Sequence, residues 1–134
     1  MKTILTLLLT VLIASAQGYK DFAKEMGYET NYNAALKKAK IEQKNLMVLM
    51  VTNYCPWCSK FEKKTLSDKK VDEAIKANYI PLILNKEEGG FPPYLNTPLV
   101  PTTYFIDPKE QKAYYERMGF VNKIEFLELL KEIE

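Results

Sequence analysis

Residues 46–62 read LMVLMVTNYCPWCSKFE, and this stretch decides how the rest of the chain is interpreted. Its first six residues are all apolar, which is typical of a β-strand buried on both faces. The cysteines Cys55 and Cys58 follow, with Pro56 and Trp57 between them, and a charged segment compatible with a helix comes next. A CxxC motif at a strand-to-helix junction favours thiol redox chemistry over a structural role.

The composition excludes several classes of site. The chain has 134 residues, a formal net charge of +2, two cysteines and no histidine. Without histidine there is no Ser-His-Asp or Cys-His pair and no His-ligated zinc or haem. Two cysteines cannot complete a four-thiolate zinc site or an iron–sulfur cluster, so we expect no metal and no cofactor. The near-neutral charge gives no basic stripe, and nucleic acid is not an expected partner.

The N-terminal segment, residues 1–16, predicts a signal peptide. Lys2 supplies a positive start, residues 3–14 are uncharged and rich in leucine, and Ala14-Ser15-Ala16 has the small-x-small pattern of a cleavage site. The run of about 12 apolar residues is short of the ~20 that a membrane-spanning helix needs. An uncleaved anchor and a buried core helix are the alternatives. We expect residues 17–134 to form one mature domain, periplasmic or secreted.

Export changes the interpretation of the cysteine pair. Outside the cytosol a disulfide can form and persist. A bridge between Cys55 and Cys58 closes a very small loop, so it restricts the unfolded chain little and stability is a poor reason for it. At a helix N-terminus the N–H groups of Trp57 and Cys58 can stabilise a Cys55 thiolate, and Pro56 suits the first helical turn. Cys55 is the predicted nucleophile and Cys58 the resolving thiol.

Other interpretations of this motif remain open at this point. The pair could be half of a zinc site shared between two chains, a copper site with Met47 and Met50, or an inert structural bridge. Nearby lysines add positive charge that would favour a thiolate, or they form a solvated helix face; they are Lys60, Lys63 and Lys64.

The remaining periodicity predicts an α/β fold. The first half of the chain is expected to form a helix in 31–44, a strand at 46–51, the CxxC helix and a helical piece that is capped by Ser67 and runs through Ile75. A strand at 79–84, weakened by Pro81, and a turn-rich loop at 86–100 come next. Strands at 102–106 and 112–117 and a helix after Asn122 complete the chain. A parallel βαβ unit followed by a β-hairpin predicts a mixed central sheet with helices on both faces.

These residues resemble the thioredoxin superfamily. The resemblance lies in residues 48–62 with 64–68, in residues 100–107 (VPTTYFID), and in Gly119-Phe120 before the last helix. It is strongest to exported thioredoxin-like domains such as the C-terminal domain of the reductant conductor DsbD and the thioredoxins of sulfur-oxidation clusters. The resemblance implies a thioredoxin-like three-layer sandwich.

The resemblance also implies roles for individual residues. Cys55 would attack and Cys58 resolve, while Pro101 would be a cis-proline facing them. A cis X-Pro bond presents a free backbone edge that suits extended polypeptides, and Val100 would pair with the substrate chain. The alternatives are a trans-proline that opens a strand and a Trp57 ring that packs on the loop. The implied substrate-binding residues are Pro56, Trp57, Val100 and Pro101.

The sequence departs from the family at several positions. Leu49 stands where thioredoxins bury an aspartate under the CxxC, and Glu62, one turn after Cys58, is at best a weak substitute. Trp57 replaces the histidine of strong periplasmic oxidases, which argues against a very oxidising pair. Tyr54 stands where a tryptophan is frequent and is expected at the active-site rim. The insertion at 89–98 is expected to shape the groove or to hold the cis-proline loop.

The sequence therefore predicts an exported thiol:disulfide oxidoreductase that reduces protein disulfides through a mixed disulfide. Its partners would be protein thiols and disulfides and a membrane electron donor, and we expect a monomer. The alternatives are a disulfide oxidase or isomerase, a binding module or chaperone without turnover, and a metal-handling protein.

Overall fold

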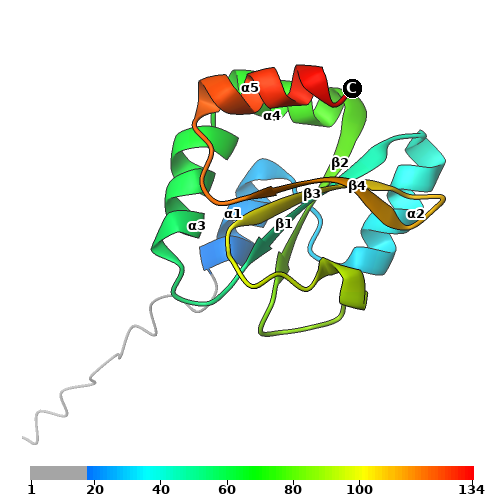
Figure 1. Cartoon of the computed structure of the whole chain (residues 1–134), viewed down its shortest axis with the longest axis horizontal. Helices are drawn as coiled ribbons and strands as arrows, with labels where there is room; N and C mark the ends of the chain where they lie inside the picture. The colour runs from blue at the N-terminus through cyan, green and yellow to red at the C-terminus, as the bar shows by residue number, and fades with distance from the viewer. Residues whose placement is uncertain (1–17) are drawn as a thin grey trace, which may run out of the picture.

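The computed structural model describes residues 18–134 (Figure 1). The signal-peptide prediction for residues 1–16 concerns residues outside this range. Within the described range, no helix has both the length and the apolar character needed to cross a bilayer.

The centre of the molecule is a mixed four-stranded sheet in the order β2-β1-β3-β4. Its strands are β1 (Asn45–Val51), β2 (Tyr79–Asn85), β3 (Thr102–Asp107) and β4 (Lys112–Met118). β1 pairs with β2 in parallel, whereas β3 is antiparallel to both β1 and β4. The predicted mixed sheet, with a parallel βαβ unit first and a hairpin last, is confirmed.

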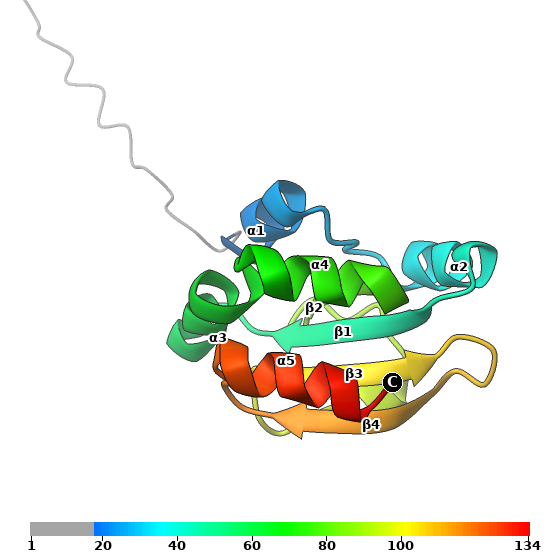
Figure 2. The ribbon, with the colours of Figure 1, turned by 90° about the horizontal axis from the view of Figure 1, so that it is seen from above.

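Helices cover both faces of the sheet, which confirms the three-layer prediction. Alternate residues of β1 point to opposite faces, and all six residues of its apolar run are buried, as expected for a strand covered on both sides. Met47, Leu49 and Val51 pack with α1, α3, α4 and α5, while the residues between them pack with α2. The helices are α1 (Gly18–Met26), α2 (Tyr32–Glu42), α3 (Pro56–Phe61), α4 (Lys69–Asn78) and α5 (Lys123–Glu132). α4 and α5 lie side by side (Figures 1 and 2).

Helix α1 was not predicted. Its apolar residues nevertheless follow the i, i+3, i+4, i+7 spacing of an amphipathic helix, and they are Tyr19, Phe22, Ala23 and Met26. All of them pack in or against the core layer that contains the two cysteines. This helix therefore belongs to the surroundings of the CxxC motif.

Proline is tolerated in β2 because of the side to which its nitrogen points. The Pro81 carbonyl accepts a hydrogen bond from the Glu29 N–H (2.9 Å), and the Ile83 N–H donates to the Glu29 carbonyl (2.9 Å). Since the N and C=O of one strand residue point the same way, the missing N–H of Pro81 faces Glu29 and not β1. The register with β1 therefore continues through Met47 and Pro81.

Of the two helix caps predicted from the sequence, Asn122 is confirmed and Ser67 is not; the cap at Asn31 was not predicted. Asn31 accepts from the Ala34 N–H (2.9 Å), and Asn122 accepts from the Glu125 N–H (3.0 Å). The predicted cap at Ser67 is wrong, because Asp68 accepts from the first N–H groups of α4. The Ser67 hydroxyl instead donates to the Lys63 carbonyl (2.6 Å) in the turn that precedes it.

Candidate active site

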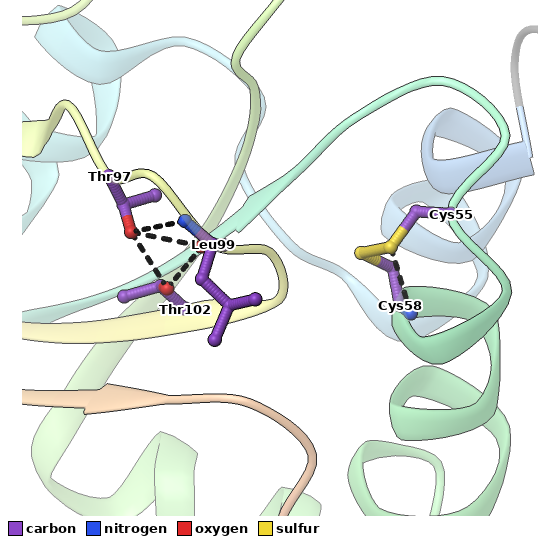
Figure 3. The surroundings of a disulfide bond; sticks show 5 residues. All are labelled: Cys55, Cys58, Thr97, Leu99 and Thr102. Carbon is purple, nitrogen blue, oxygen red and sulfur yellow. Dashed lines mark hydrogen bonds between the residues drawn. A yellow bond between two sulfur atoms is a disulfide. The ribbon is translucent and has the colours of Figure 1, made fainter.

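The two cysteines lie at the junction between β1 and α3, as the sequence predicts. Their Sγ atoms are 2.14 Å apart, a disulfide (Figure 3). Cys55 is the N-cap residue of α3, and its Sγ accepts a hydrogen bond from the Cys58 N–H (3.1 Å). Pro56 occupies the first helical position, where its lack of an N–H costs nothing. The chain reaches Cys55 through Tyr54, which has a φ of +53° and is 85% exposed.

The two sulfurs differ in accessibility. Cys58 is only 3% exposed and is part of the core layer, whereas Cys55 is half-buried at its edge. The neighbouring Pro56 and Trp57 are exposed, Trp57 by 56%. A partner molecule therefore reaches Cys55 first, in keeping with its predicted role as the attacking thiol.

In the view of Figure 3 the loop before β3 points toward the disulfide. The peptide bond between Val100 and Pro101 is cis, with Pro101 buried and Val100 half-buried. Val100 packs against the same core layer as Cys55 and Cys58. The loop is linked to α3 through Gly119 and Phe120, because the Gly119 N–H donates to the Pro101 carbonyl (2.7 Å) and the Phe120 ring contacts that of Trp57 (centroids 5.9 Å apart).

Two buried threonines hold the loop in place. The Thr102 hydroxyl donates to the Leu99 carbonyl (2.6 Å), and the Leu99 N–H donates to the Thr97 hydroxyl (3.3 Å). The two hydroxyl oxygens are 3.1 Å apart. The Lys86 ammonium donates to the Thr97 carbonyl. Both backbone groups of Leu99 are therefore occupied within the protein.

Replacing Thr97 by valine should lower the free energy of unfolding by about 1–3 kcal/mol. The substitution keeps the shape of the side chain but removes the hydroxyl that bonds the Leu99 N–H and the buried Thr102 hydroxyl. Urea denaturation measures the change. Thr30→Val is the matched control, because Thr30 is exposed and we expect almost no effect there. Equal effects of the two substitutions would show that the hydroxyl of Thr97 does not hold the loop.

Glu62 is a buried carboxylic acid in the same region. It follows Cys58 by one turn, is 7% exposed, and its Oε1 atom has no hydrogen-bond partner. Burial raises the pKa of Glu62 from 4.5 to about 7, while the positive charge of Lys63 partly opposes the shift. Glu62 and both cysteines line one cleft of about 670 Å³, which α1 closes with Tyr19, Asp21, Phe22 and Glu25.

The local backbone accounts for the position of Glu62. The helix that begins at Pro56 widens after Phe61 into one π-helical turn, η1 (Glu62–Leu66), in which the Ser67 N–H donates to the Glu62 carbonyl (2.9 Å). Such turns occur frequently at functional sites. The spacing of four residues between Cys58 and Glu62 is the signal in the sequence that places this acid one turn after the motif. Leu49, in the place of the family's aspartate, is fully buried in the same layer.

The three lysines near the motif have different surroundings. The Lys60 Nζ lies over the rings of Trp57 and Phe120, whereas Lys63 lines the α1 cleft and Lys64 is exposed. Among residues 18–134, no group of three or more histidine, cysteine, aspartate or glutamate side chains is arranged to hold a metal ion.

The model of a thioredoxin-like family matches residues 28–108, which include the CxxC motif and the cis-proline loop. The chain belongs to this thioredoxin-like family. The chain has the thioredoxin fold, and its cysteines Cys55 and Cys58 lie at disulfide distance. These two features are typical of an oxidoreductase. No curated protein sequence is significantly similar to the chain.

Solved structures show the same thioredoxin-like fold. A thioredoxin from Thermus thermophilus has a TM-score of 0.68 at 23% identity, covering 79% of this chain and 85% of its own. A disulphide isomerase from Xylella fastidiosa has a TM-score of 0.59 at 17% identity, covering 75% of this chain and 86% of its own. The reduced C-terminal domain of DsbD from Neisseria meningitidis has a TM-score of 0.57 at 19% identity, covering 76% of this chain and 93% of its own. The resemblance to DsbD domains seen in the sequence is therefore confirmed at the level of the fold.

Proposed function

We propose that this protein is an exported thiol:disulfide oxidoreductase that reduces disulfides in other proteins. The observation that supports the proposal is the unequal exposure of the cysteine pair. Cys55 is half-buried at the N-terminus of α3, and its partner Cys58 is buried in the core layer.

The reaction transfers two electrons in two exchanges. In the reduced protein the Cys55 thiolate attacks one sulfur of a client disulfide, forms a mixed disulfide and releases the first client thiolate, which takes up a proton. The Cys58 thiolate then attacks the Cys55 sulfur and releases the second client thiolate. The Cys55–Cys58 disulfide closes as the client is reduced. The Cys58 N–H, 3.1 Å from the Cys55 Sγ, stabilises the attacking thiolate.

Cys58 must lose its proton before it can attack, and Glu62 is the acid–base group beside it. The Glu62 carboxyl lines the same cleft, and its pKa of about 7 suits proton exchange near neutral pH. We assign the Glu62 carboxylate as the proton acceptor, directly or through water in the cleft. This role replaces that of the aspartate whose position is taken by Leu49.

Client binding uses the loop on the other side of the disulfide. The Val100 backbone pairs with an extended client chain, and Pro56, Trp57 and Pro101 form the walls of the groove. Residues 1–16 direct export to the periplasm or beyond, where a membrane electron donor restores the dithiol. The protein acts as a monomer in this scheme.

The reduction potential of the Cys55–Cys58 pair tests the direction of electron flow. We expect a value near thioredoxin's ~−270 mV, because Trp57 stands where strong oxidases have a histidine that stabilises the thiolate. Equilibration of the protein with defined dithiol buffers measures it. A value of about −180 to −120 mV would identify a disulfide donor or isomerase instead. The absence of a two-electron equilibrium would contradict the oxidoreductase proposal itself.

A further inference from the structure

A lysine ammonium is held between two aromatic rings at the rim of the disulfide. The Nζ of Lys60 lies 4.6 Å from the centroid of the Trp57 ring and 5.1 Å from that of Phe120. The two rings are themselves in contact, with centroids 5.9 Å apart. We call these three residues the Lys60 clamp.

The clamp is anchored in the core. Phe120 packs edge-on against Phe61 (centroids 6.0 Å apart), and Phe61 packs in the same way against Phe126 (5.6 Å). Both Phe61 and Phe126 are fully buried. The aromatic rings therefore restrict the position of the Lys60 ammonium. The ammonium of a free lysine on a solvated helix would have no such restriction.

The charge of Lys60 is not neutralised within residues 18–134, where Lys60 has no salt bridge. Acidic groups close to the motif lie elsewhere: Asp21, Glu25 and Glu62 line the α1 cleft, and Asp68 pairs with Lys123 (3.7 Å). A cation–π contact leaves an ammonium charged, with N–H groups free to donate. Lys60 thus presents an available positive charge.

The clamp connects α3 with the cis-proline loop. Trp57 lies between the cysteines on α3, and Lys60 follows it by one turn. On the other side, Phe120 follows Gly119, whose N–H donates to the Pro101 carbonyl (2.7 Å). A client chain that pairs with Val100 and brings its disulfide to Cys55 therefore passes close to this charge.

We propose that Lys60 determines specificity by selecting client disulfides that are flanked by aspartate or glutamate. The inference rests on the proposed function and adds a substrate class to it. An acidic residue next to the client cysteine meets a positive charge already held in position, while a basic residue there is repelled.

The test uses three disulfide-bonded peptides that differ only in the residue next to the cysteine, which is Glu, Gln or Lys. The second-order rate constant of reduction by the reduced protein is measured for each. We expect the Glu peptide to react about 3–10 times faster than the Lys peptide, with the difference shrinking in high salt. In Lys60→Gln this ratio should fall to about 1, and in Lys60→Arg it should remain.

Lys64→Gln is the matched control, because it removes the same charge from an exposed position in the next turn. We expect its Glu-to-Lys ratio to stay within about twofold of the unmodified protein, since Lys64 lies four residues farther along the chain from Cys55 than Lys60, and solvent screens its charge over that distance. An equal loss in Lys64→Gln would overturn the proposal, as would the absence of any preference in the unmodified protein. If Lys60→Gln lowered the rate constants of all three peptides equally, the proposal would also be overturned, since Lys60 would then act on the Cys55 thiolate. Failure of the proposed function looks different, because no peptide would be reduced at all.

Discussion

Replacing Cys58 by serine should trap a covalent mixed disulfide between Cys55 and client proteins. The half-buried Cys55 can still attack, but the serine that replaces the buried Cys58 cannot displace the client. The lost step is intramolecular, with the two residues one helical turn apart, so release should slow about 100-fold or more. Non-reducing electrophoresis and intact-mass spectrometry of the reduced variant after mixing with an oxidised client detect the adduct.

Cys55→Ser is the matched control for the trapping experiment. The remaining thiol of Cys58 is 3% exposed, and we expect little or no adduct from it. Equal trapping by the two variants would contradict the assigned order of attack. Client binding that stays unchanged and non-covalent in Cys58→Ser would indicate a binding module, and loss of a stoichiometric metal ion would indicate a metal-handling protein.

Replacing Glu62 by glutamine should change how stability depends on pH. The pKa of the Glu62 carboxyl rises from 4.5 to about 7 on folding because the carboxyl is buried. A raised pKa means that the folded state holds its proton more tightly. The contribution of this group to stability is therefore fully present below pH 4.5 and is lost as the pH rises to about 7. The amide of glutamine does not titrate. Between pH 4.5 and 8 the stability of Glu62→Gln relative to the unmodified protein should rise by at most about 3 kcal/mol.

Urea denaturation of the oxidised protein at several pH values measures this difference. Glu128→Gln serves as the control, because Glu128 is exposed on α5 and its replacement should shift stability by the same small amount at every pH. A constant difference between Glu62→Gln and the unmodified protein would show that Glu62 is not buried as an acid. A difference that falls with pH would show that folding favours the carboxylate, the opposite of what its surroundings imply.

Much of the fold could be predicted because it depends on neighbours in the chain. The apolar run of β1 indicated a strand covered on both faces, and the Asn122 side chain caps α5 as expected. Cys55 and Cys58, three residues apart at the end of β1, could be placed at a helix N-terminus from local spacing alone. Helix α1 was missed although its apolar spacing was visible, and Asp68 replaced Ser67 as a cap because two capping residues stand next to each other.

The sequence by itself determined the redox pair, the order of the elements and the mixed sheet, because strand burial, helix caps and the CxxC turn are set by residues within a few positions of one another. The tertiary structure decided the surroundings of that pair. It buried Glu62 in a cleft closed by α1, tied Leu99 to Thr97 and Thr102, and placed Phe120 against the Lys60 of α3. The acidity of Glu62 and the available charge of Lys60 depend on burial and on contacts between distant segments, and these exist only once the chain has folded.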